Sequence, residues 1–258
     1  MVKPRRKTSS KARKMNSESA QLSVATQAAS PARPDDLATA TDPALTPDQA
    51  QALLKRHDLP TEAIEHLSKN AAVAKSRKVR IAIAAHPRTS RRLALRLIRA
   101  FYTFDLMQFA LQPTVAADLK RAADEMLVTR LASITLGERI ALARRASPTV
   151  AAALLLDKET RVWQTALENP RLTEAALIKA LLREKATAAF VAAVSHHAKW
   201  SPRREIRMAL LHNEKTPLAR ALEFARTLPP PQLRDALHNS RLPEKVKTYL
   251  RKESRLSG

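Results

Sequence analysis

Apolar residues recur at helical spacing along most of the chain, and similar polar steps interrupt them. Each unit consists of an apolar helical stretch, a His, Asn or Ser step that often contains Pro, a Thr or Ser, and a Leu-rich stretch. Because proline lacks an N–H and restricts the residue before it, each step predicts the end of one helix and the start of the next. Thr173 and Ser201 are the expected caps of two following helices.

The repeated units predict the fold class. They cover residues 52–67, 78–98, 108–123, 139–156, 161–181, 205–225 and 233–250, with a degenerate unit at 190–206. A helix pair with one apolar stripe is not stable alone, whereas stacked pairs bury their stripes in one core. We therefore expect an all-α fold, a right-handed α-solenoid of about seven or eight short helix pairs over residues 47–252. The residues expected inside are Leu95, Leu97, Leu177, Leu181 and Leu222, and those expected outside are Arg91, Arg145 and Arg203.

A longer repeat, which spans several of these units, is also present. Residues 79–126 align without a gap on residues 206–253, so every position in the first segment has its match at one constant offset in the second. Arg80 and Arg207 are among the identical pairs, and Val79 with Ile206 keeps its apolar character. The alignment predicts a larger unit that is used twice, with residues 137–199 between the two copies.

The segments VRIAIAAHPRTS (79–90) and VWQTALENPRLT (162–173) carry a resemblance to a known family. They are similar to the leucine-rich repeat variant and HEAT-like α-helical repeats of bacterial proteins, of the uncharacterised kind. The resemblance covers about residues 50–252 at the level of the fold, and it brings no catalytic residues. Some leucine-rich repeat variant proteins carry a Cys-bound iron–sulfur module, which a chain without cysteine cannot hold.

The composition excludes several classes of site. Gly137 and Gly258 are the only glycines, so a glycine-rich phosphate loop or dinucleotide turn cannot be written. The absence of cysteine removes disulfides, thiolate nucleophiles and zinc ribbons. No long apolar stretch or secretion signal is present, which predicts a cytoplasmic protein without membrane insertion. No cofactor is expected.

The net charge of +22 is unevenly distributed. Residues 1–14 carry seven basic residues and no acidic one, and residues 51–258 hold +19. Residues 1–46 contain few large apolar groups and are expected to form a disordered tail with a basic tip. That tip is either a solubilising terminus or an electrostatic arm for a polyanion. Residues 253–258 are expected to fray.

Arginines are the strongest candidates for a nucleic-acid interface. Arg88, Arg92 and Arg99 fall near one stripe of a helix, and further arginines lie close to the breaks between units. If they align along the stack, they form a basic ribbon that follows phosphates without reading sequence; otherwise they are a solvated surface. The candidate residues are Arg88, Arg92, Arg99, Arg144, Arg145, Arg203, Arg204 and Arg207.

Trp163 and Trp200 are candidates for contact with a partner, through an exposed aromatic ring. The alternative places Trp163 in the core between repeats and makes Trp200 a hydrophobic staple. An exposed Trp in a basic groove is also similar to the HEAT-like DNA glycosylases. In that case Asp157 or Glu159 would supply the required carboxylate.

The remaining polar residues suggest no catalytic or metal site. His196 and His197 are adjacent on a helix and point about 100° apart, so they cannot clamp one metal ion. His86 and His212 instead match the positions of helix-ending asparagines. We therefore expect a scaffold that binds a protein or peptide and is not an enzyme. The alternative is nonspecific nucleic-acid binding, with a glycosylase as the third hypothesis.

Overall fold

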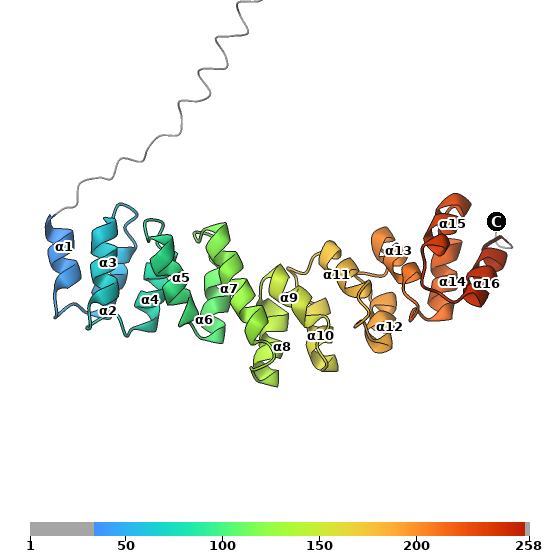
Figure 1. Cartoon of the computed structure of the whole chain (residues 1–258), viewed down its shortest axis with the longest axis horizontal. Coiled ribbons are helices and arrows are strands. Elements are labelled where there is room, and N and C mark those ends of the chain that lie inside the picture. Colours follow the sequence, from blue (N-terminus) through green and yellow to red (C-terminus); the bar gives the residue numbers. More distant parts are fainter. Residues whose placement is uncertain (1–33, 256–258) are drawn as a thin grey trace, which may run out of the picture.

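The computed structural model describes residues 34–255, which contain sixteen helices and no strand. The first eight are α1 (Pro34–Thr41), α2 (Pro47–Leu54), α3 (Thr61–Lys69), α4 (Arg77–Ala85), α5 (Arg91–Arg99), α6 (Thr103–Leu111), α7 (Ala117–Arg130) and α8 (Leu136–Arg145). The others are α9 (Pro148–Leu154), α10 (Thr160–Leu167), α11 (Glu174–Leu181), α12 (Ala188–His196), α13 (Arg204–His212), α14 (Leu218–Arg226), α15 (Pro230–His238) and α16 (Glu244–Arg255). Figure 1 shows these short helices following one another along one long axis. None of the described helices has the length and apolar character needed to cross a bilayer.

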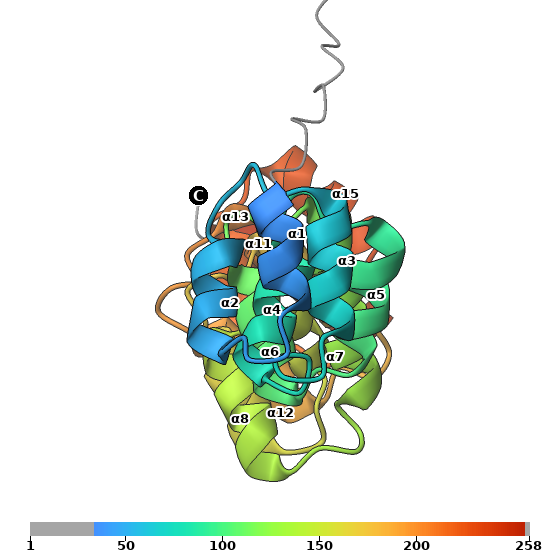
Figure 2. The ribbon, with the colours of Figure 1, turned by 90° about the vertical axis from the view of Figure 1, so that its left-hand side faces the viewer.

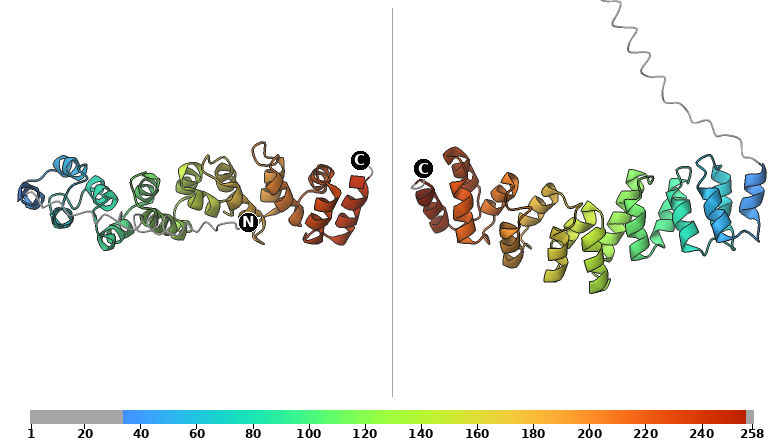
Figure 3. Two further views of the ribbon diagram at one scale, coloured as in Figure 1. Left: turned by 90° about the horizontal axis from the view of Figure 1, so that it is seen from above. Right: turned by 180° about the vertical axis from the view of Figure 1, so that it is seen from behind.

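The helices form two rows, because many of them pack on the helix two places further along the chain. In the odd row, α1 packs on α3, and contacts run from α5 through α7, α9, α11 and α13 to α15. In the even row, α2, α4 and α6 pack in succession, as do α8, α10 and α12, and α14 packs on α16. Figure 1 shows α8, α10 and α12 below α9, α11 and α13, and Figure 2 shows α2 and α3 on opposite sides of α1. The two views of Figure 3 show that the whole molecule is elongated and bowed.

The core lies between the two rows and follows the expected pattern of burial only in part. Leu177 and Leu181 are fully buried, and Arg145 and Arg203 are exposed, as is Arg91. The predicted core residues Leu95, Leu97 and Leu222 are only partly buried, although all three pack against core side chains. Part of the apolar stripe on α5 and α14 therefore remains accessible to water.

The two expected helix caps differ in outcome. Thr173 caps α11, because its hydroxyl accepts the backbone N–H of Ala176 at 3.3 Å. Ser201 does not cap α13, which begins after Arg203 and has no side-chain cap. The hydroxyl of Ser201 instead accepts a hydrogen bond from the guanidinium of Arg220 at 2.8 Å. Ser201 and Pro202 belong to the turn that precedes α13, so the helix starts beyond the reach of the Ser201 hydroxyl.

The longer repeat is visible in the helix boundaries. The offset of the sequence alignment relates both ends of α4, α5 and α6 to those of α13, α14 and α15 respectively, and it relates the start of α7 to that of α16. Side-chain bonds repeat as well: the hydroxyl of Thr89 donates to the carbonyl of Ile83, and that of Thr216 to the carbonyl of Leu210. We call α4–α7 the first copy and α13–α16 the second copy. Equivalent members are an odd number of helices apart, so α4 lies in the even row and α13 in the odd row.

His86 follows α4 and links it to the helix before it in the even row. Its ring Nε2 lies 2.8 Å from the carbonyl oxygen of Arg56, and its Nδ1 accepts the backbone N–H of Arg88 at 3.2 Å. Both bonds require a neutral ring with its proton on Nε2. Burial lowers the pKa of His86 from its ordinary value, in keeping with this neutral form.

Asn213 makes the same link in the second copy. Its amide nitrogen donates to the carbonyl of Leu181 at 2.6 Å, and its amide oxygen accepts the backbone N–H of Lys215 at 2.8 Å. The histidines and asparagines that end these helices therefore bond mainly to the neighbouring helix of the row rather than to their own last carbonyls. Similar side-chain links join Asn70 to Ala40, Asn169 to Ala143 and Ser240 to Leu211.

The helical part begins earlier than residue 47, the boundary predicted from the sequence. Helix α1 packs on α3, with Ala40 fully buried, and Asp36 forms an ion pair with Arg56 at 2.7 Å. The prediction of a tail through residue 46 is therefore wrong for residues 34–46. In this mostly polar segment Ala40 and Leu45 are buried and hold it against the rest of the structure. Helix α16 likewise continues to Arg255, into the segment expected to fray. The rest of the predicted tail, residues 1–33, and residues 256–258 lie outside the described residues.

Candidate functional site

Three hollows follow one another along the exposed side of the odd row. The first, of about 520 Å³, lies between α3 and α5; the second, of about 380 Å³, lies between α5 and α7. The third, of about 610 Å³, is lined by α7, α9 and α11. Leu95 and Arg99 line both the first and the second hollow, and neighbouring residues of α7 line the second and the third. We call this continuous feature the groove.

The floor of the groove is apolar. Leu95 and Met126 line its first half, where both are partly buried and pack on the core. In the third hollow, Ala153 and Ala176 face the groove, and their short side chains leave the space between α9 and α11 open. An exposed apolar floor rimmed by polar groups is typical of a surface that binds a partner.

The rim of the groove is strongly basic. Only two acidic residues, Glu65 and Glu125, line the three hollows. Of the cations, Arg130 is engaged, since its guanidinium donates to the carbonyls of Phe101 and Arg99 at 2.7 and 2.9 Å. The eight cationic residues that line the groove are Lys69, Arg92, Arg96, Arg99, Arg130, Lys179, Arg183 and Lys185.

Of the eight arginines predicted from the sequence, the structure brings only Arg92 and Arg99 together in the groove. Arg144 and Arg145 are exposed at the end of α8. The remaining four bond elsewhere: Arg88 to the carbonyl of Asp58 at 2.9 Å, Arg203 to Glu174 at 2.7 Å, Arg204 to Gln232 at 2.9 Å and Arg207 to the carbonyl of Ser201 at 3.0 Å. The eight arginines are therefore spread over several parts of the structure, and only two of them share the groove.

Sequence reasoning left Lys69, Lys179, Arg183 and Lys185 out of the candidate site. They lie on or beside α3 and α11, which precede and follow the region of densest arginine. The sequence did not show that the helices alternate between two rows, so these four residues could not be assigned to the same face. Once every second helix is known to share a face, the cations of α3, α5 and α11 fall on one side.

Both tryptophans are buried, which corrects the expectation that they contact a partner. Trp163 is 4% exposed and meets Phe190 edge to face, with ring centroids 5.7 Å apart. Trp200 is 1% exposed, and its indole N–H donates to the carbonyl of Leu167 at 3.0 Å. Neither ring offers a face to a partner or a base, so the interpretation of Trp163 as core is the correct one.

The carboxylates considered for a glycosylase form local structural contacts. Asp157 is paired with Arg139 at 3.2 Å, and both side chains are nearly buried. The backbone N–H of Glu159 donates to the carboxylate of Asp157 at 2.9 Å, just before α10. With no exposed Trp beside them, these groups do not form the arrangement that the glycosylase hypothesis requires.

The histidines are likewise engaged in local bonds. His196 lies 2.9 Å from the carbonyl of Ala192, and His197 lies 3.0 Å from Glu168. Within residues 34–255, no group of three His, Asp or Glu side chains is placed to hold a metal ion.

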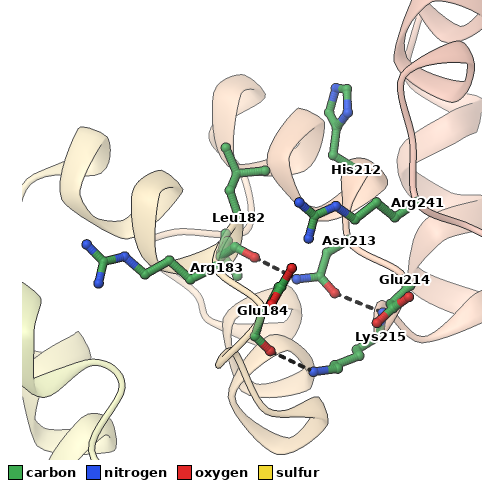
Figure 4. Close-up of a pocket in the computed structure, with 9 residues that line it drawn as sticks. Leu182, Arg183, Glu184, His212, Asn213, Glu214, Lys215 and Arg241 are labelled. Carbon is green, nitrogen blue, oxygen red and sulfur yellow. Dashed lines mark hydrogen bonds between the residues drawn. The ribbon is translucent and has the colours of Figure 1, made fainter.

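A smaller cavity lies between α11 and α13, where side-chain hydrogen bonds connect the two helices. We call such a connection between neighbouring helices of a row, like that made by His86 or Asn213, a joint. Figure 4 shows Asn213 and Lys215 bridging the two helices, with Arg183 pointing away from them. The ammonium group of Lys215 donates to the carbonyl of Glu184 at 3.2 Å, and Asn213 makes the two bonds described above. About 20 Å³ is open there, little more than the space for one water molecule.

Asp124 is a buried acid on α7. The residue is 7% exposed, and its Oδ1 has no hydrogen-bond partner among the described residues. Burial raises the pKa of this carboxyl, opposed by the hydroxyls of Ser147 and Thr149. Thr149 also lines the third hollow, so Asp124 lies beneath the groove rather than in it.

Comparisons of the chain with protein-family models, with curated proteins and with solved structures find no match.

Proposed function

We propose that this chain is a non-catalytic binding scaffold, a right-handed α-solenoid of about seven or eight helix pairs that holds a protein or peptide partner. The observation that carries the proposal is the continuity of the three hollows along the odd row. Stacked helical repeats provide extended surfaces of this kind, and a segment of a partner could lie across several helices. The apolar floor at Leu95, Met126 and Ala153 supplies the contact area that such binding needs.

A second candidate function is nonspecific binding of nucleic acid, favoured by the excess of cations on the rim. Phosphate contacts by Arg99 and Lys179 would make such binding steeply dependent on salt. Two observations weigh against it. The residues that line the groove in the described part of the chain include no Phe, Tyr or Trp on which bases could stack, and most predicted ribbon arginines lie elsewhere.

The experiment is a capture comparison with the full chain as bait. Ala153→Arg fills the floor of the third hollow with a large side chain that suits a helix. Arg144→Ala, on α8 outside the groove, is the control. We expect proteins captured by the wild-type chain and by the control to be lost from Ala153→Arg. Equal capture by all three baits would contradict the groove as the binding surface.

A further inference from the structure

The arginines of α5 are crowded without any local compensation. Arg92, Arg96 and Arg99 are all exposed, and within residues 34–255 none of them has an ion-pair or side-chain hydrogen-bond partner. They are three and four residues apart on one helix, a spacing at which like charges destabilise the helix. On the same helix Arg91 differs, because it pairs with Asp118 at 2.9 Å. The fold alone gives no reason for the three unpaired cations.

The second copy has an equivalent helix that lacks two of the three arginines. In the gapless alignment of the two copies, Arg92 corresponds to Ala219 and Arg96 to Glu223, while Arg99 is retained as Arg226. Helix α14 nevertheless has the same length and packs on α16 as α5 packs on α7. Arg92 and Arg96 are therefore dispensable for building this helix, and both line the first hollow of the groove.

The chemistry of the groove specifies its ligand. Unpaired guanidinium groups on a rim attract carboxylates, and an apolar floor with small residues such as Ala153 and Ala176 accepts apolar side chains. We infer that the groove binds an acidic segment of another protein, in which Asp or Glu residues are interspersed with apolar residues. This inference rests on the proposed function and names the partner's chemistry.

The charge and length of the groove limit which acidic segment can bind there and how long it is. The chain's own residues 1–14 carry seven basic residues and no acidic one, so the basic rim repels them. Five stacked helices, at about 9 Å per step, give the groove a length of about 36 Å. An extended segment of about eleven residues spans that length at about 3.3 Å per residue.

The test is a selection of peptides on the full chain. A random library of 12-residue peptides is displayed and selected on the wild-type protein, and the affinities of the selected peptides are measured by fluorescence anisotropy. The variant Arg92→Ala/Arg96→Glu places the residues of the second copy on α5. The control, Arg144→Ala/Arg145→Glu, makes the same change in charge on exposed residues of α8. Circular dichroism checks the helix content of both.

We expect the selected peptides to be enriched in Asp or Glu together with Leu, Ile or Met. Their affinity should fall at least tenfold in Arg92→Ala/Arg96→Glu and change less than twofold in the control. Selected peptides that are neutral, and that lose affinity when Ala153→Arg fills the groove, would overturn the acidic partner and leave the scaffold standing. A failure of every groove variant to weaken any selected peptide would overturn both. Tighter binding of a 12-nucleotide single strand, lost in Arg92→Ala/Arg96→Glu, would assign the groove to nucleic acid instead.

Discussion

The two copies of the longer repeat share a backbone plan and differ in what they present to the solvent. Helices α4–α6 and α13–α15 have matching boundaries, and the hydroxyl bond of Thr89 recurs at Thr216. The link made by His86 recurs at Asn213 with a different side chain. A few polar side-chain bonds and the periodic apolar stripe are therefore enough to define the helix boundaries and their packing. Other residues differ between the two copies.

The changes fall into two kinds. In the core, Phe109 of the first copy is replaced by Ala236, and both are buried, so each copy has its own packing. On the surface, α5 carries cations that α14 lacks. The residues that build these helices are therefore distinct from those, such as Arg92 and Arg96, that make the α5 part of the groove basic.

The largest expected effect comes from exchanging core residues between the copies. Phe109 is fully buried and meets Phe101 edge to face at 5.7 Å, so Phe109→Ala leaves a cavity. We expect a loss of about 3–5 kcal/mol in the free energy of unfolding, measured with urea, although Ala is the native residue of the second copy. The reverse change, Ala236→Phe, should cost about 1–3 kcal/mol through overpacking. A change near zero in the free energy of unfolding for both variants would show that Phe and Ala are interchangeable at this core position.

Loss of a joint should have the next largest effect. Asn213→Ala leaves the carbonyl of Leu181 and the N–H of Lys215 without their partner, at a cost of about 1–3 kcal/mol in the free energy of unfolding. Asn239→Ala is the control, because Asn239 is exposed and its side-chain amide makes only a long bond, 3.4 Å, to the carbonyl of Asp235 in its own helix. Its effect should stay within about 0.5 kcal/mol. Equal losses in urea unfolding for the two variants would contradict the role of Asn213 as a joint.

The two joints should also respond differently to pH. Burial lowers the pKa of His86 in the folded chain, so below about pH 6.5 the unfolded chain binds more protons than the folded one. The stability that neutral His86 supplies is therefore present above this pH and is lost as the pH falls towards the lowered pKa.

The matched variant for this effect is His86→Asn, which copies the joint of the second copy. It should keep the bonds to Arg56 and Arg88 and reduce the loss of stability between pH 7.5 and 5.5, followed by urea unfolding at each pH. An unchanged pH dependence in His86→Asn would show that another group is responsible.

The all-α class could be predicted from the sequence, because proline steps and apolar stripes at helical spacing are local signals. The gapless offset between residues 79–126 and 206–253 reappears in the helix boundaries. The start of the helical part was placed too late, since the anchors Ala40 and Leu45 lie in a polar context. Of the candidate site residues, Arg92 and Arg99 line the groove, whereas Trp163 and Trp200 are buried. The helices that share a face are set by the alternation of the two rows. The order of helices along the sequence does not reveal this alternation.

The smallest expected effect is on stability when the groove is changed. Arg92→Ala/Arg96→Glu should alter the free energy of unfolding by less than about 0.5 kcal/mol, because α14 is built with those residues and the arginines have no local partners. Urea unfolding in parallel with Arg144→Ala/Arg145→Glu measures this. A loss of several kcal/mol would make the arginines of α5 structural.

We expect a partner to bind along α5 and α7, the two helices that the first copy contributes to the groove, and not along their equivalents α14 and α16; the absence of cysteine allows a test at matched positions. Ala122 lines the second hollow on α7, and its equivalent on α16 is the exposed Tyr249. A selected acidic peptide carrying a bromoacetyl group is incubated with Ala122→Cys or Tyr249→Cys, with iodoacetamide as the reagent that reports thiol accessibility. We expect the peptide to become covalently attached to Ala122→Cys and not to Tyr249→Cys, while iodoacetamide modifies both. Equal attachment to the two, or preferential attachment to Tyr249→Cys, would contradict this expectation.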